Sequence, residues 1–436
     1  MSQSYKNRIA IVGGGFGMVA LLDGLLARGL TRTRIDIYAK CHDEIGEAYK
    51  AVPDVFIMNT QTAALGMFDH ILPLGDWLKT GVRVAPANPD YLPRRIFGQY
   101  LNQVRARLIN AHRLQGNEVE LLPAVDFVDG DGQIHDINGR VHATGCTVLS
   151  LGFGSDTQVA DTARRILSVP QGGRLSIIGS GLTGIDMILL STYLRPDLSI
   201  DCYSLSGRFP RVRSNFATGL PSVLGDLVTA PDVRLRDVLH RIETCASDAD
   251  DLAMYRGDLN PSDEIAYAKE RVSLAQQAMY NATRDYADVF RRMPDADRSI
   301  MMRHRPTFVE RRVMYPLCNA TKIQDLCADG ILRLHRKAVN PGDINPETTL
   351  RAYNDSTPLG RFAARSGLRA NPFGGVMGQR DGCVCDKRGI YALGPITNGF
   401  RYFTEASSIT KRDAELACDA MMARLSQTTE RMVADL

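Results

Sequence analysis

The sequence predicts an α/β protein that contains two units in which a strand passes through a glycine-rich turn into a helix. The first unit has the apolar run Ile9–Val12, followed by Gly13-Gly14-Gly15-Phe16-Gly17. The second has Leu175–Ile178, followed by Gly179-Ser180-Gly181-Leu182-Thr183-Gly184. A pair of such units predicts two domains. The length of 436 residues and the 44% hydrophobic content are enough to give each domain a buried core.

Each turn is placed to hold a phosphate group, because glycine lets the backbone N–H groups at a helix N-terminus come close to a ligand. The second turn matches the pattern G-x-G-x-x-G in full. In the first, Gly13 and Gly15 take the first two positions and Met18 takes the third. Phosphate approach depends mainly on the first two glycines, so both units are predicted to bind a dinucleotide. The simplest pair is FAD at the first turn and a nicotinamide coenzyme at the second.

The residues after the second strand of each unit bear on the choice of coenzyme. An acidic residue that binds a ribose hydroxyl is expected near Ala39, where the chain has Ala39-Lys40 instead. The corresponding strand of the second unit also ends without a carboxylate, and Arg208, Arg211 and Arg213 follow. Guanidinium groups form forked hydrogen bonds with phosphate, which favours NADPH over NADH. The alternative interpretation is a solvated basic loop.

The composition argues against several classes of protein. A net charge of +3 gives no case for binding nucleic acid or an anionic membrane. The sequence shows no apolar signal core and no uninterrupted spanning segment, so a cytoplasmic location is expected. Nine scattered cysteines do not form a disulfide framework and are expected to be reduced thiols. No metal-binding motif or serine elbow is present.

Further motifs resemble the FAD/NAD(P)-binding oxidoreductases that nest one dinucleotide fold inside another, a group related to flavin monooxygenases and amine N-hydroxylases. These motifs are Gly46–Tyr49, Ile57–Thr60, Leu92–Leu101, Leu393–Pro395 and the helical stretch around Arg291–Pro294 and Arg303–Pro306. The resemblance implies two Rossmann-like domains, the second inserted in the first. The FAD domain comprises residues 1–168 and 336–436. The NAD(P) domain comprises 169–335, with a helical insertion at about 231–330.

The turns and the resemblance together define the predicted cofactor site. Its residues are Gly13, Gly15, Phe16, Gly17, Lys40, Gly46, Tyr49, Met58, Asn59, Gly179, Gly181, Leu182, Thr183, Gly184, Arg208, Arg211, Arg213, Gly394 and Pro395. No residue is assigned a catalytic step, because the chemistry in such proteins belongs mainly to the cofactor. Asn59, Arg94 and Arg95 are candidates for contacting flavin or substrate. The alternative roles are bonding to a loop backbone for Asn59 and surface solvation for the two arginines.

The resemblance implies an FAD- and NADPH-dependent monooxygenase. In that scheme a flavin C4a-hydroperoxide transfers oxygen from O2 to a small amine or amino-acid-derived substrate, most simply on nitrogen. Two alternatives remain open. One is a flavin-dependent oxidoreductase or dehydrogenase with an acceptor other than O2. The other is a dinucleotide-binding protein without catalysis. The sequence alone does not identify the substrate or the oligomeric state.

Overall fold

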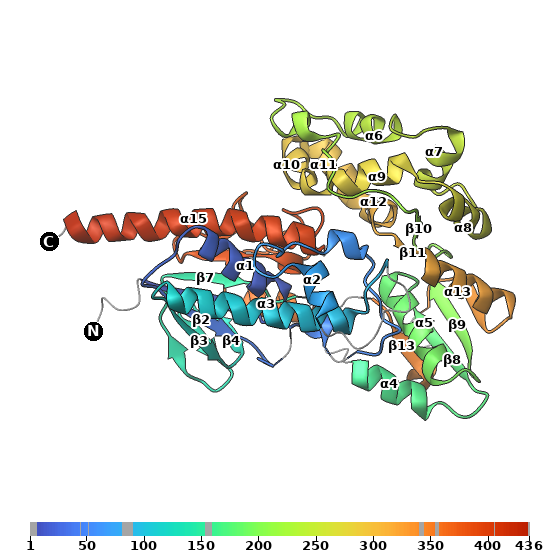
Figure 1. The fold of residues 1–436 in the computed structure, drawn as a ribbon, viewed down its shortest axis with the longest axis horizontal. Helices are drawn as coiled ribbons and strands as arrows, with labels where there is room; N and C mark the ends of the chain where they lie inside the picture. Colours follow the sequence, from blue (N-terminus) through green and yellow to red (C-terminus); the bar gives the residue numbers. More distant parts are fainter. Residues whose placement is uncertain are drawn as a thin grey trace.

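The computed structural model describes residues 7–43, 45–50, 52–80, 90–152, 159–339, 344–353, 357–404 and 406–434. Figure 1 shows three bodies: a sheet domain that holds both chain ends, a second sheet domain around β8 and β9, and a group of helices above it. The secondary structure is mixed α/β with two mainly parallel sheets, as the sequence predicts.

The first sheet has six strands in the order β14-β15-β7-β1-β2-β3. Their bounds are β1 Arg8–Val12, β2 Arg34–Tyr38, β3 Glu118–Leu122, β7 Cys146–Leu149, β14 Cys383–Cys385 and β15 Ile390–Ala392. All neighbours are parallel except β14 and β15. Because β15 pairs with β7, strands from both ends of the sequence form one sheet, and the second sheet is inserted between them in the chain.

Helix α1 (Phe16–Ala27) is buried on almost every side from Phe16 to Leu25. It lies between α3 (Arg94–Leu114) and the C-terminal helix α15 (Ser407–Ala434). Its one buried carboxylate, on Asp23, accepts hydrogen bonds from Lys411 of α15 at 2.5 Å and from His70 at 2.7 Å. The C-terminal helix therefore completes the core of the first domain.

A small antiparallel sheet and several short elements complete the first domain. The small sheet consists of β4 Val125–Val128, β5 Ile134–Asp136 and β6 Val141–His142. The helices are α2 Leu74–Lys79 and α14 Thr357–Arg365, with short 3₁₀ turns at Glu47–Tyr49, Thr62–Ala64 and Gly394–Thr397.

The second sheet has four parallel strands in the order β12-β9-β8-β13. Their bounds are β8 Arg174–Ile178, β9 Ser199–Ser204, β12 Leu332–Arg336 and β13 Thr349–Arg351, and the sheet packs with α4 Val159–Ser168, α5 Leu182–Leu194 and α13 Leu317–Ala328. Strand β13 lies beyond residue 335, where the sequence places the return to the first domain. We propose that the return follows β13, because this strand hydrogen-bonds to β8.

The predicted helical insertion consists of α6 Leu235–Glu243, α7 Ala249–Arg256, α8 Pro261–Glu270, α9 Leu274–Asn281, α10 Tyr286–Arg292, α11 Asp295–Arg303 and α12 Arg305–Arg312, with 3₁₀ turns at Gly225–Val228 and Ala282–Arg284. The chain enters and leaves it through the parallel pair β10 Val212–Arg213 and β11 Tyr315–Pro316. Its core also includes Tyr402, Phe403 and Ile409 from the first domain. The helical insertion therefore packs against the C-terminal part of the first domain. Helices α8 and α13 contribute instead to the core of the second sheet.

Three further features of the structure bear on the sequence predictions. In the part of the chain that is described, no helix combines the length and apolar character needed to cross a membrane. All nine cysteines have free thiols. The described residues contain no group of three or more His, Cys, Asp or Glu side chains arranged to hold a metal ion.

Candidate functional site

The first glycine turn is shaped by close contacts with the end of β7. Gly13 has a φ of +121°, and a Cβ atom there would overlap the carbonyl oxygen of Ser150. A Cβ atom at Gly17 would overlap the hydroxyl of the same serine. Both glycines are therefore required by the protein's own packing, and Gly17 lets the start of α1 approach the sheet.

Met18 and Ala39 stand where a glycine and an acidic residue are expected. Met18 is 1% exposed and belongs to the core around α1, so it points away from the ligand side of the turn. Ala39 is buried, and a Cβ atom at Gly14 would lie 2.8 Å from its methyl group. A small side chain at position 39 thus lets the turn pack against β2. Lys40 follows it on the surface.

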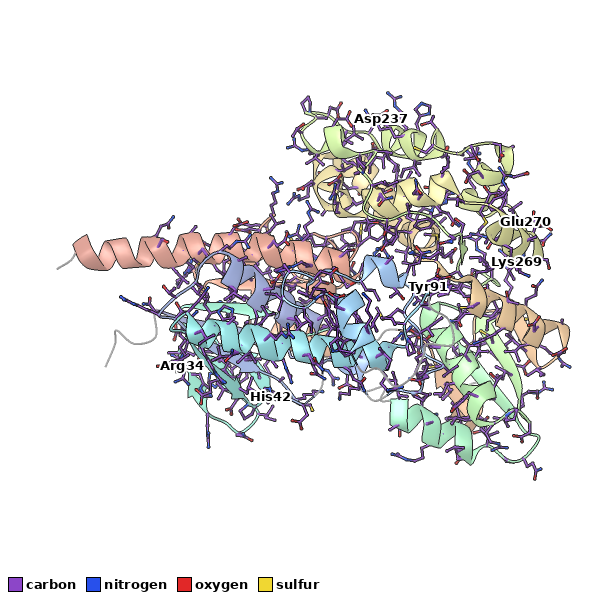
Figure 2. All side chains as sticks on the ribbon, viewed as in Figure 1. Arg34, His42, Tyr91, Asp237, Lys269 and Glu270 are labelled. Atoms are coloured by element: carbon purple, nitrogen blue, oxygen red, sulfur yellow. The ribbon has the colours of Figure 1, made fainter. Side chains whose placement is uncertain are left out.

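The loop after β2 passes close to the turn and is anchored by His42 (Figure 2), whose Nε2 lies 2.8 Å from the carbonyl oxygen of Leu122. On the other side of the turn, Gly46 lies against Gly15, because a Cβ atom at Gly46 would lie 3.2 Å from the Cα atom of Gly15. Gly15 itself has open space, since the nearest atom to a Cβ built there is 4.0 Å away. This open position is where a ligand has room to approach the turn.

Other predicted residues of the first site gather at the same edge of the sheet. Gly394 follows β15, and its neighbour Leu393 donates its amide hydrogen to Leu149 O at 2.8 Å. The carboxyl ends of β1, β7 and β15 therefore lie side by side, which brings Gly394 and Pro395 to the edge that holds Gly13. Gly394 has a φ of +72°.

Tyr49 and Met58 lie beside α3. The ring of Tyr49 contacts Phe97 edge-on at 5.5 Å, and its backbone touches Gly98 so closely that a Cβ atom there would overlap Tyr49 O. Burial raises the pKa of Tyr49, and the charge of Arg94 opposes that rise. Met58 is buried and hydrogen-bonds through its amide to Leu92 O, while Asn59 next to it is half-buried. These residues line the start of α3.

The second glycine turn has the same opening geometry but a different close contact. Gly179 has a φ of +112° and donates to Tyr203 O at 2.8 Å. A Cβ atom at Gly184 would overlap the carbonyl oxygen of Gly179. Gly181 has no atom within 4 Å of its Cβ position, and both Gly181 and Thr183 are exposed. With Leu182 half-buried between them, the turn presents an open N-terminus of α5.

The three arginines predicted to bind a 2′-phosphate have different surroundings. Arg208 lies beside the second turn, because Ser180 donates its hydroxyl hydrogen to Arg208 O at 2.7 Å, and its side chain bonds to Glu310 at 2.8 Å. Arg211 is buried and paired with Glu264. Burial raises the pKa of Glu264, and Arg211 opposes that rise. Arg213 is also buried. Only Arg208 is thus available at the turn.

Arg94 joins the two domains, whereas Arg95 does not. The Nη1 atom of Arg94 lies 2.8 Å from Oδ2 of Asp186 on α5, and its Nε donates to Ile57 O at 3.1 Å. The side chains of Arg94 and Asp186 are only 19% and 13% exposed. Burial raises the pKa of Asp186, and Arg94 opposes that rise. Arg95 instead forms a two-pronged pair with Asp54 inside the first domain, with both contacts at 2.9 Å.

Three residues of the site were not found from the sequence. Ser150 shapes the first turn, Asp186 ties the second turn's helix to Arg94, and Arg336 touches Gly207, where a Cβ atom would lie 2.6 Å from that of Arg336. Asp186 lies two residues after the last glycine of the turn, but its partner is far away in the sequence. Arg336 is exposed at the end of β12, next to the loop that carries Arg208.

The fold places the two glycine turns in two separate Rossmann-like domains. Residues 10–154 match the FAD-NAD(P)-binding family. This part of the chain is therefore an FAD/NAD(P)-binding domain, which confirms the predicted resemblance and cofactor class. The chain has no match among curated protein sequences.

Solved structures share the fold of the whole chain. Ornithine hydroxylase from Pseudomonas aeruginosa aligns with a TM-score of 0.51 and 12% identity over 96% of this chain and 99% of that chain. The FAD-bound cadaverine monooxygenase of desferrioxamine biosynthesis from Erwinia amylovora has a TM-score of 0.53 and 11% identity over 98% and 95%. L-lysine 6-monooxygenase from Pseudomonas syringae has a TM-score of 0.51 and 13% identity over 96% and 100%. These likenesses confirm the nested two-domain fold.

Proposed function

We propose that the protein is an FAD- and NADPH-dependent monooxygenase that adds oxygen to the nitrogen of a small amine or amino-acid-derived substrate. The main support is the arrangement of two open glycine turns on separate sheets, joined by the buried Arg94–Asp186 pair. The three structures with the same fold, whose names describe a hydroxylase and two monooxygenases of amines, also support this proposal.

The residues at the first turn fit FAD. The open space at Gly15 and the amide groups at the start of α1 suit a pyrophosphate. Gly46 lies against Gly15, and Gly394 follows β15 at the same edge of the sheet. Ala39 supplies no carboxylate for the ribose, so this end of the cofactor would be held by other groups of the loop after β2.

The residues at the second turn fit NADPH. Gly181 leaves room for a pyrophosphate at the start of α5. Beyond β9, the side chain of Arg336 packs against Gly207 next to Arg208, and no acidic residue lies between Tyr203 and Arg208. This charge favours a coenzyme with a 2′-phosphate. Glu310 pairs with Arg208 in the free protein. Arg208 would therefore exchange Glu310 for the 2′-phosphate when NADPH binds.

FAD, when bound, takes two electrons from NADPH and makes O2 reactive toward a soft nucleophile. In the overall reaction one oxygen atom forms an N–O bond with the amine. The other leaves as water, which takes its two electrons and one hydrogen from the hydride of NADPH and its second hydrogen from one added proton. The chain's own residues bind and orient the two nucleotides, and the Arg94–Asp186 pair holds the helix of one turn against the domain of the other. Their contribution is orientation and exclusion of water.

The test is to purify the protein, measure flavin absorbance, and follow NADPH and O2 consumption with a panel of small amines. The proposal expects a yellow protein that consumes NADPH and O2 in equal amounts when a substrate amine is present, with a lower KM for NADPH than for NADH. Turnover that needs an organic acceptor under anaerobic conditions would instead identify a reductase or dehydrogenase. A colourless protein that binds NADPH but not added FAD would identify a binding protein.

A further inference from the structure

Arg213 is a buried cation without an acidic partner. It is 3% exposed, and its Nε and Nη1 atoms are buried and have no hydrogen-bond partner among the described residues. Two residues earlier in the chain, Arg211 is also buried but is paired with Glu264. Burying a charge is costly unless a counter-charge or hydrogen bonds satisfy it. Arg213 therefore stands out as the unsatisfied member of a closely matched pair.

Aromatic rings hold the Arg213 guanidinium from one side. Its Cζ atom lies 4.8 Å from the ring centre of Phe216 and 4.6 Å from that of Tyr280. These two ring centres are only 5.5 Å apart, so the rings lie next to each other rather than on opposite sides of the cation. Ring faces attract a cation but offer no strong hydrogen-bond acceptor. The N–H groups on Nε and Nη1 are thus held in place without a hydrogen-bond acceptor among the described residues.

Arg213 lies at a joint, where the first domain, the second sheet domain and the helical insertion meet. It lies on β10, which pairs with β11 where the chain enters and leaves the helices. Tyr91 of the first domain is buried nearby, and Figure 2 shows it where the bodies meet. Burial raises the pKa of Tyr91 to about 12, and the charge of Arg213 opposes that rise. Next to Arg213, Asn215 accepts a hydrogen bond from Gln61 of the first domain.

We infer that Arg213 binds the carboxylate of a small-molecule substrate at this joint, and not the 2′-phosphate of NADPH. The guanidinium fork matches the two oxygens of a carboxylate. The rings of Phe216 and Tyr280 contact Arg213, and its charge acts on Tyr91 of the first domain, whereas Arg208 is the arginine that contacts the second glycine turn. This inference rests on the proposed function and narrows its substrate to an amine that also carries a carboxylate.

The first experiment needs no turnover. The thermal stability of the free protein is compared for R213M and R211M, with R213Q as a second neutral variant. If Arg213 is held for a ligand, removing its charge leaves the Tm unchanged or raises it. R211M is the matched control, and its Tm falls because Glu264 loses its partner. If the Tm of both Arg213 variants fell as much as that of R211M, the contact of Arg213 with the two aromatic rings would serve stability alone. That result would overturn the inference.

The second experiment uses flavin-loaded enzyme and two pairs of probes, L-lysine with cadaverine and L-ornithine with putrescine, which differ in the carboxylate. The wild type is expected to prefer the carboxylated member at least tenfold in binding, measured by the rise in Tm, and R213M to lose this preference with an unchanged KM for NADPH. Equal binding of both members by the wild type would overturn the inference. So would an effect of R213M on the KM for NADPH alone. A failure of O2 consumption would count against the proposed function only.

Discussion

The two glycine turns of this protein look alike but use their glycines differently. In the second, Gly184 packs against the carbonyl of Gly179 within the same turn. In the first, the residue at the corresponding position is Met18, which is buried in the core, and Gly17 makes the close contact, with Ser150 of the neighbouring strand. The comparison shows that the close approach of helix and sheet can be met by a glycine one position earlier. The spacing of the pattern is therefore less important than the contact that it serves.

What both turns share is an open second glycine. Gly15 and Gly181 make no contact closer than 4.0 Å at their Cβ positions, whereas the first and last glycines of each turn are crowded by protein atoms. The crowded glycines serve the fold and the open ones leave room for a ligand. The following predictions separate these two roles.

The largest effect is expected for Gly13→Ala. The new methyl group would overlap Ser150 O in a backbone conformation with φ of +121°, so the free energy of unfolding should fall by about 3 kcal/mol or more. Gly179→Ala should cost less, because its Cβ atom would lie 2.8 Å from Ala352 O. Chemical denaturation measures both, with Gly181→Ala as the unstrained control. A Gly13 variant as stable as that control would contradict the assignment of Gly13 to the fold.

A smaller effect, confined to ligands, is expected for Gly15→Val and Gly181→Val. Both positions have room for the side chain in the free protein, so the Tm should stay close to that of the wild type. Each variant should lose about a hundredfold in affinity for one nucleotide, because the side chain fills the space of the pyrophosphate. Fluorescence titration is expected to show loss of FAD binding in the first variant and of NADPH binding in the second. If both nucleotides were lost together, the two turns would not be separate sites.

The smallest effect is expected where the two domains meet. Arg94→Lys shortens and reshapes the contact with Asp186, so the domains should be less well aligned. Reduction of bound flavin by NADPH, followed by stopped-flow absorbance, should slow by about tenfold with little change in the Kd for either nucleotide.

Arg95→Lys is the matched control for this pair, because Arg95 is the next residue and binds Asp54 within one domain. It should leave the rate of flavin reduction unchanged. An equal slowing in both variants would mean that Arg94 supports the first domain only and does not align the two.

Much of the fold follows from local patterns. The strands that end at Val12 and Ile178, the glycine turns and the helices after them are set by alternation, apolar spacing and the conformational freedom of glycine, all of which lie within about 20 residues. The helical insertion at about 231–330 was likewise predicted from the sequence. In the C-terminal helix, Ala414, Ala417 and Met421 follow helical spacing and are buried in the core of the first domain.

The sequence by itself thus determined the two nucleotide-binding units and their order. The tertiary structure decided which of the predicted residues act together. Arg208, Arg211 and Arg213 look equivalent in sequence, but one lies at the second turn, one is neutralised by Glu264, and one lies at the joint without a counter-charge. In the same way only the packed domains bring Arg94 to Asp186 and β13 to β8. The physical reason is that charge pairing and strand pairing depend on distance in space, whereas propensity and periodicity depend only on neighbours along the chain.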